Sequence, residues 1–362
     1  MSRARALARR LREPLIRAAL VLISLALCLA AAEAIVRLAQ PQSSPYTGRG
    51  LYQPDPDLGH VLRPDHTSGD VHTNSFGFRD REYALAKPAG TFRIVGLGDS
   101  FTFGAAFPGG IYLERLEAKL TQAGRAAEVI NTGVPAYSTV QEIGHLKKFG
   151  IRFAPDLVVL GLFPTGDVVE NLSDEHLEVV DGELTDRAVD GWQRWLMRSH
   201  LYRLLRARTT VHAAAPADPL ALEGFLGVEF ERLQICRRKP RKYIPPAYEL
   251  TERLLVELRD YLKARGAALV VLLIPDEVQV SPELFQAVLA AKGGAPADYD
   301  LDLPTRRLRE FCRSRSIDVV DVLEECRTQN RAEPVYKRAD THWNERGYEI
   351  AAQKLFEYVM AR

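Results

Sequence analysis

The chain has 362 residues, 46% of them hydrophobic and 26% charged, with a formal net charge of +1. This balance excludes a general attraction to nucleic acid or acidic polymers and allows a packed core. The length is long for one domain and short for three. We therefore expect a globular protein without a nucleic-acid partner, and the sequence leaves its oligomeric state open.

The first 40 residues differ from the rest. Six arginines lie within residues 3–17 beside one acid, Glu13. Residues 18–32 carry no charge, and Glu33 is the only charge between Arg17 and Arg37. Such a run is near the length that crosses a bilayer as a helix, and its basic flank is expected to stay in the cytoplasm. We expect a membrane anchor over residues 1–40 with the remainder outside the cytoplasm. A signal peptide cleaved after Ala30-Ala31-Ala32, which would give a secreted protein, is the alternative.

Residues 41–90 are rich in Pro, Gly and Asp, which predicts an extended linker, and its segment 72–83 is expected to dock on the following domain. From residue 91 onward, apolar runs alternate with amphipathic helical patterns. This alternation predicts a parallel sheet flanked by helices. The expected strands are 92–97, 127–131, 156–163, 268–275 and 317–322; the expected helices are 111–123, 139–149, 247–266, 303–316 and 344–360.

Residues 166–246 show no clear strand and are interpreted as an insertion, with an aromatic amphipathic helix at 191–208. Three cysteines fall on the expected exported side: Cys236, Cys312 and Cys326. No cysteine spacing resembles a metal site, so we expect no metal and no cofactor. Cys312 and Cys326 either pair in an oxidising compartment or remain isolated buried thiols.

Polar residues follow the expected strands where ligands bind in open parallel sheets. They are Gly98-Asp99-Ser100, Asn131-Thr132-Gly133 and Pro164-Thr165-Gly166-Asp167, with Asp340 and His342 before the last helix and Asn344 as its possible cap. A serine hydroxyl needs a neighbouring base to become a nucleophile, and a carboxylate orients that base. Ser100, His342 and Asp340 are therefore the predicted catalytic residues. Taken singly, each element also fits an ordinary turn, cap or surface residue.

These segments resemble the SGNH hydrolases, also called the GDSL esterase/lipase family, over residues 92–360. The resemblance rests on "GLGDSFTFG", "VINTGVPAYSTVQE" and "DTHWNERGYEIAA", with an Asp-x-His spacing similar to membrane-anchored and alginate-acetylation-type members. It implies a three-layer α/β/α sandwich with a five-stranded parallel sheet. It also implies an oxyanion hole that includes Ser100 and Gly133, with Gly166 at the third position.

The third block departs from the family pattern, because "FPTGD" has Gly166 where an asparagine donor is expected. Loss of one such donor typically lowers kcat about 10²–10³-fold. The backbone N–H of Gly166, or the side chains of Thr165 or Asn171, are candidate substitutes. Asp99, Asn131, Thr165 and Asp167 are the expected substrate-binding residues.

We expect an exported serine esterase or O-acyltransferase that acts on a small-molecule or carbohydrate ester, with a cell-envelope carbohydrate as the favoured class. Hydrolysis and acyl transfer share one acyl-enzyme, and the sequence does not choose between them. The alternative is a weakly active or non-catalytic glycan-binding protein of the same fold.

Overall fold

The computed structural model describes residues 2–39, 50–104, 110–172, 177–180, 182–186, 199–202, 204–205 and 223–362. The chain divides into two compact units. The first consists of residues 1–43 and 188–215, and the second of residues 44–187 and 216–362. Each unit is described by itself below.

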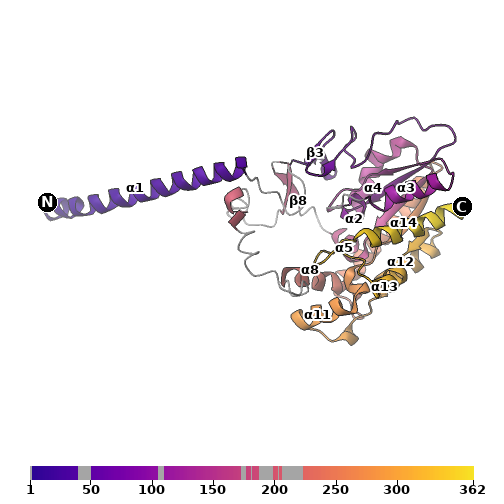
Figure 1. The fold of residues 1–362 in the computed structure, drawn as a ribbon. Coiled ribbons are helices and arrows are strands. Elements are labelled where there is room, and N and C mark those ends of the chain that lie inside the picture. Colours follow the sequence, from indigo (N-terminus) through magenta and orange to yellow (C-terminus); the bar gives the residue numbers. More distant parts are fainter. Residues whose placement is uncertain are drawn as a thin grey trace. The chain divides into compact units, whose positions relative to one another are not determined.

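In the first unit, helix α1 (Ser2–Ala39) is long and apolar enough over Leu15–Ala39 to cross a bilayer (Figure 1). A membrane anchor and a signal sequence share this property. The Glu33 carboxylate accepts hydrogen bonds from the Ser199 hydroxyl (2.7 Å) and from the backbone N–H groups of His200 and Leu201 (2.9 and 2.8 Å). These bonds link α1 to a short helical stretch at 200–202. Most of the expected helix 191–208 lies outside the described residues.

The second unit contains a five-stranded sheet in the order β11-β10-β7-β5-β6, with every neighbouring pair parallel. The central strand β7 is buried along its whole length, as strands covered by helices on both faces are. This confirms the expected sheet. Its strands are β5 (Phe92–Gly98), β6 (Ala127–Asn131), β7 (Leu157–Leu162), β10 (Ala268–Leu273) and β11 (Asp318–Asp321).

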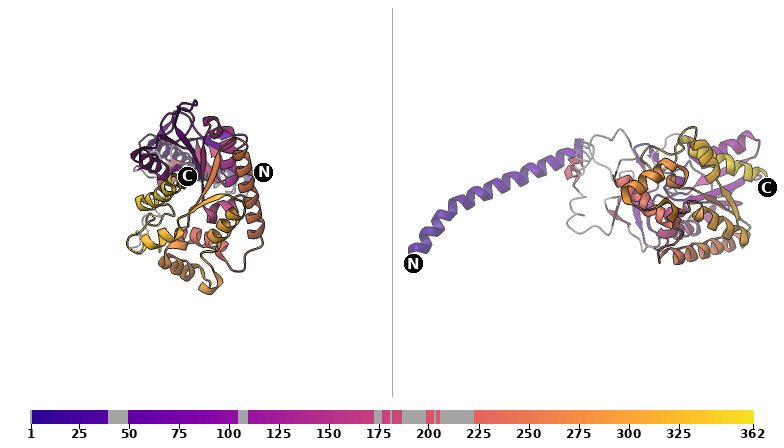
Figure 2. Two further views of the ribbon diagram at one scale, coloured as in Figure 1. Left: turned by 90° about the vertical axis from the view of Figure 1, so that its right-hand side faces the viewer. Right: turned by 90° about the horizontal axis from the view of Figure 1, so that it is seen from below.

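Helices cover both faces of this sheet and complete three layers (Figure 2). Val158 and Leu160 of β7 pack into one apolar cluster, which includes residues of α4, α9 and α12. Leu157 and Val159 point to the opposite face and pack with residues of α3 and α14. The bounds are α3 (Tyr112–Gln122), α4 (Thr139–Lys148), α9 (Ile244–Lys263), α12 (Leu303–Ser314), α13 (Leu323–Asn330) and α14 (Glu345–Met360).

The remaining described elements are helices and paired strands outside the five-stranded sheet. The helical ones are α2 (Ser100–Phe103), η1 (Gly150–Phe153), α5 (Pro164–Glu170), α8 (Glu223–Leu233), η3 (Gln234–Cys236), α10 (Glu277–Val280), α11 (Pro282–Lys292) and η4 (Pro296–Asp298). The strands form three antiparallel pairs: β1 (Tyr52–Asp55) with β2 (Gly59–Leu62), β3 (Thr67–Ser68) with β4 (Val71–His72), and β8 (Leu177–Val180) with β9 (Glu183–Asp186).

The pair β8–β9 shows that the expectation of a strand-free insertion was wrong. Val180 pairs with Glu183, and Gly182 between them has a φ of 79°. Asp-Gly between two short apolar runs is a strong hairpin signal, and residues 181–182 have this sequence. Leu184 of this hairpin packs on Leu51 and Tyr52 of the segment after α1.

Residues 50–90 pack along the domain. Arg93 is fully buried in β5, and its guanidinium donates to the carbonyl oxygens of Ala84 and Leu85 while it pairs with Glu128. Within segment 72–83, the Asp80 carboxylate accepts a hydrogen bond from the N–H of Asn131 (2.7 Å). The cysteines whose pairing the sequence left open, Cys236, Cys312 and Cys326, are buried free thiols.

Candidate active site

Ser100 stands at the turn between β5 and α2. A Cβ on Gly98 would lie 1.9 Å from the Oγ1 atom of Thr102, so only glycine fits this turn without rearrangement. The Asp99 carboxylate accepts the N–H of Phe101 (2.8 Å) and thereby caps the new helix, and burial raises its pKa. Because Ser100 is the first residue of α2, its N–H has no hydrogen-bond partner among the described residues.

The side chains of Ser100, His342 and Asp340 form one hydrogen-bonded row. The His342 Nε2 atom lies 2.7 Å from Ser100 Oγ, and its Nδ1 atom lies 2.6 Å from Asp340 Oδ1. Burial alone would raise the pKa of Asp340, but the hydrogen bonds and charge of His342 outweigh it and hold this pKa below its ordinary value. The ionised carboxylate is the form that orients an imidazole toward a serine.

The loop that carries His342 is held at both ends. The N–H of Lys337 donates to the carbonyl oxygen of His342 (2.9 Å), and Trp343 is fully buried beside it. Asn344 caps α14 by accepting the N–H groups of Arg346 and Gly347, which confirms the expected cap. The position of His342 is therefore determined by the start of α14.

Gly133 lies in the loop after β6, where its backbone packs against α2. A Cβ at this position would lie 2.5 Å from the backbone nitrogen of Phe103. Its N–H donates to Oδ1 of Asn131 (2.9 Å), so this predicted oxyanion donor already has an intramolecular acceptor. The Asn131 side chain therefore stabilises the loop after β6 in this structure.

The polar groups of the third block also form hydrogen bonds within the protein. The N–H of Gly166 donates to the carbonyl oxygen of Phe163 (3.1 Å), and the Thr165 hydroxyl donates to Asp276 (2.7 Å). The Asp167 carboxylate accepts the N–H of Phe163 (2.7 Å), and burial raises its pKa well above the ordinary value. Asn171 joins α4 to α9 by accepting from Val140 and donating to Thr251. Among the described residues, the Oδ1 atom of Asp167 is buried without a hydrogen-bond partner.

Two residues near these loops escaped the sequence analysis. Arg232 of α8 donates from its guanidinium to the hydroxyl of Thr341, the residue between Asp340 and His342. Ala136, in the loop after Gly133, has a left-handed backbone (φ 62°), a conformation that non-glycine residues rarely adopt and that often marks functional loops. Neither carries a motif, so only the fold brings them to notice.

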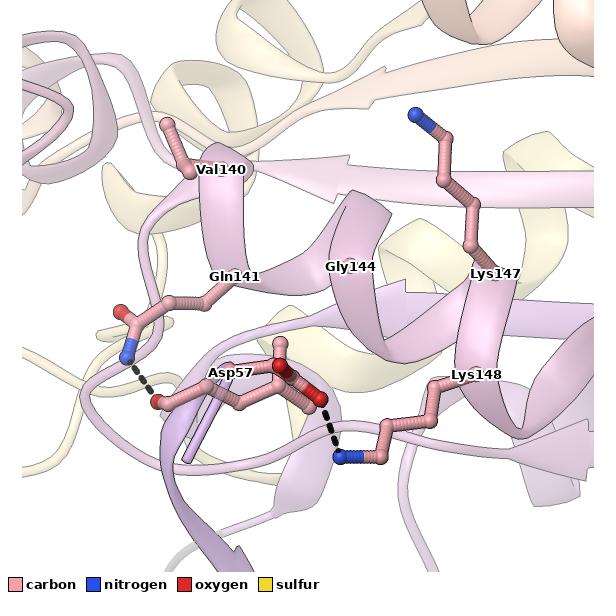
Figure 3. A pocket seen from close by; sticks show the side chains of 7 residues that line it. Asp57, Val140, Gln141, Gly144, Lys147 and Lys148 are labelled. Atoms are coloured by element: carbon pink, nitrogen blue, oxygen red, sulfur yellow. Dashed lines mark hydrogen bonds and ion pairs between the residues drawn. The ribbon is translucent and has the colours of Figure 1, made fainter. Parts of the chain in front are cut away.

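Two cavities lined by described residues lie apart from the serine. One, of about 430 Å³, is lined by Asp57, Leu58, Val140, Gln141, Gly144, Lys147 and Lys148, and the Lys148 ammonium lies 2.7 Å from the Asp57 carboxylate across it (Figure 3). The other, of about 770 Å³, lies between segment 70–83 and α3 and includes Arg79, Asp80 and Glu114. No predicted site residue lines either cavity.

Comparisons with known proteins give one family match. Residues 241–362 match the model of the SGNH hydrolase-like domain of the acetyltransferase AlgX. Similar solved structures include a GDSL-like lipase from Bacteroides thetaiotaomicron (14% identity, TM-score 0.39, covering 75% of this chain and 88% of that one). Others are an acetyl xylan esterase (13%, 0.41, 74% and 99%) and a lipase/acylhydrolase from Enterococcus faecalis (13%, 0.41, 75% and 96%). No curated protein sequence matches the chain.

Proposed function

We propose that the chain is a serine esterase or O-acyltransferase that works through Ser100, His342 and Asp340, because residues 241–362 match the SGNH hydrolase-like domain. The observation that carries the proposal is the hydrogen-bonded row of these side chains, with His342 between the hydroxyl and the carboxylate. The matched segment contains Asp340 and His342, and the fold adds Ser100 to them.

The proposed reaction has two halves. His342 Nε2 takes the proton of Ser100 Oγ as that oxygen attacks the ester carbonyl, and Asp340 stabilises the imidazolium that forms. His342 then gives this proton to the leaving alcohol, which departs and leaves an acyl group on Ser100. Water or a second hydroxyl loses a proton to His342 and attacks the acyl carbonyl. The bond between Ser100 Oγ and the acyl carbon then breaks, His342 returns the proton to the serine oxygen, and the free acid or the acylated acceptor departs. The N–H of Ser100 can donate to the oxyanion directly. The N–H of Gly133 can do so only after its hydrogen bond to Asn131 Oδ1 breaks.

The proposed substrate is an O-acylated carbohydrate of the cell envelope, because we propose that the second unit lies outside the cytoplasm and is held there by α1. The bonds from Ser199, His200 and Leu201 reach Glu33, which lies after the alternative cleavage position, so they fit an anchor and a cleaved signal peptide equally.

The test is labelling by a fluorophosphonate, which reacts with an activated serine. We expect stoichiometric labelling of the full chain in detergent, loss of labelling in Ser100→Ala, and hydrolysis of p-nitrophenyl acetate by the same preparation. Folded protein that neither labels nor hydrolyses the ester would instead support a non-catalytic glycan-binding protein. Adding mono- and oligosaccharide acceptors then separates transfer from hydrolysis, because a transferase forms acylated sugar at the expense of acetate.

A further inference from the structure

The third block lacks an asparagine donor at Gly166, and the ring of Phe163 fills the space beside this position. A Cβ on Gly166 would lie 2.8 Å from the Cδ1 atom of Phe163, so this aromatic ring stands where a longer side chain would begin. The ring of Phe101 links this position to the site, with centroid distances of 4.9 Å to Phe163 and 5.1 Å to His342.

Arg232 reaches this place from a different part of the chain. Its guanidinium carbon lies 5.2 Å from the centroid of the Phe163 ring, and its Nη1 atom donates to Thr341 Oγ1. These two contacts place the cation between the end of β7 and the loop that carries His342. The helix that supplies it, α8, belongs to the insertion and not to the core sheet.

The charge of Arg232 is not cancelled by its nearest carboxyl group. Glu229 lies 3.3 Å from Nη1, but its side chain is fully buried. Burial and the neighbouring carboxylate of Asp276 raise the pKa of Glu229 well above its ordinary value, which favours the neutral acid. The Nε and Nη2 atoms of Arg232 have no partner among the described residues, and the side chain is 24% exposed. A bound molecule therefore meets an available cationic donor.

We propose that Arg232 binds the ester oxygen that becomes negatively charged when Ser100 attacks, in place of the side-chain donor that the third block lacks. This inference rests on the proposed function. As the serine oxygen bonds to the carbonyl carbon, the π electrons move to the carbonyl oxygen, and the guanidinium N–H groups donate to that oxygen without transferring a proton. When the tetrahedral intermediate collapses, the electrons return and the leaving alcohol departs. A donor aimed at charge that exists only in the transition state raises kcat rather than lowering KM.

The experiment compares Arg232→Gln and Arg232→Lys with the wild type in p-nitrophenyl acetate hydrolysis. This substrate is neutral, so recognition of a substrate anion plays no part. We expect kcat to fall about 10²–10³-fold in Arg232→Gln, with KM nearly unchanged and a smaller loss in Arg232→Lys. Guanidinium ion added to Arg232→Ala should restore part of the rate. Arg241→Gln is the matched control, because Arg241 is an exposed arginine paired with Glu231.

A second measurement separates binding of the oxyanion from support of the His342 loop. If Arg232 acts only through Thr341, then Thr341→Val will lose as much kcat as Arg232→Gln, and the proposal is overturned. Unchanged kcat in Arg232→Gln, with the fold verified by thermal melting, overturns it as well. Fluorophosphonate labelling keeps the two hypotheses apart: an unlabelled wild type contradicts the proposed function, whereas a labelled wild type with an equally fast Arg232→Gln contradicts only the role of Arg232. If Arg232→Gln does not fold, Arg232→Ala measured with and without added guanidinium ion provides the comparison.

Discussion

The Nε2 atom of His342 lies 2.7 Å from Oγ of Ser100, although 242 positions separate the two residues along the chain. The contact exists because Ser100 follows the carboxyl end of β5 and His342 precedes α14, which packs on the same sheet. An imidazole nitrogen within hydrogen-bond distance of a serine hydroxyl is positioned to remove its proton.

The row of side chains predicts how its removal affects the rate. His342→Ala should lower kcat for p-nitrophenyl acetate by at least about 10³-fold, and Asp340→Asn should also be severe, because residues of such a unit act together. His72→Ala, which changes an exposed histidine of β4, serves as the control and should leave the rate unchanged. Near wild-type turnover in either of the first two variants would refute the assignment.

The packing of segment 72–83 predicts a dependence of stability on pH. Burial raises the pKa of Asp80 from 3.8 to about 7. Between about pH 4 and pH 7 the folded chain therefore holds a proton that the unfolded chain has released, so the free energy of unfolding falls as the pH rises through this window. Asp80→Asn should make this fall shallower, and Asp70→Asn, at an exposed carboxylate, should leave it as in the wild type. Urea unfolding from pH 5 to pH 8 measures the slopes, and equal slopes in all three proteins would contradict the prediction.

The sheet and the row of site residues could be predicted from sequence for a physical reason. Strands buried on both faces appear as continuous apolar runs, as in "DLVVLGLF", and the polar residues that follow them gather at one edge. The oxyanion donors could not be predicted in the same way. Whether the N–H of Gly133 or Gly166 is free depends on local bonds to Asn131 and Phe163, and no spacing in the sequence reveals these bonds.

The left-handed backbone of Ala136 predicts a stabilising substitution. A non-glycine residue in this region costs about 1–2 kcal/mol, whereas glycine adopts it freely but loses more chain entropy on folding. Ala136→Gly should therefore raise the free energy of unfolding by about 0.5–1 kcal/mol. Ala118→Gly, in the exposed face of α3, should lower it by about 1 kcal/mol. Chemical denaturation measures both, and a loss of stability in Ala136→Gly would show that packing of the Ala136 methyl group on the cluster around Tyr137 outweighs the backbone strain.

The basic flank and apolar helix α1 predict the topology of the chain. A reporter fused after residue 362 should be active only if it functions outside the cytoplasm, and deletion of residues 1–40 should release the protein from the membrane fraction. An intact mass for the membrane-bound protein would support an anchor, whereas loss of about the first 32 residues would indicate a cleaved signal peptide. Activity of a cytoplasmic reporter on the full chain would contradict both alternatives.

The substitution Gly166→Asn tests whether the asparagine of the family pattern can be restored in this chain. Its backbone is helical, so asparagine meets no left-handed strain there, but the new Cβ would lie 2.8 Å from the Phe163 ring. We expect Gly166→Asn to lower the free energy of unfolding by about 1–3 kcal/mol, as overpacking does, and to give no gain in kcat. Gly224→Asn, in a helical position with nothing within 4 Å of the new Cβ, should be nearly neutral.

The double variant Phe163→Leu with Gly166→Asn identifies the cause. If the ring is the obstacle, the two changes should be less destabilising together than the sum of their separate effects, because the smaller side chain gives the amide room. Thermal melting and kcat for p-nitrophenyl acetate measure both consequences. A gain of about 10-fold in kcat for Gly166→Asn alone would show that the ring moves aside at little cost and that an amide can act as the oxyanion donor. In that case the Phe163 ring does not exclude a side-chain donor at position 166, and no substitute donor from Arg232 is required.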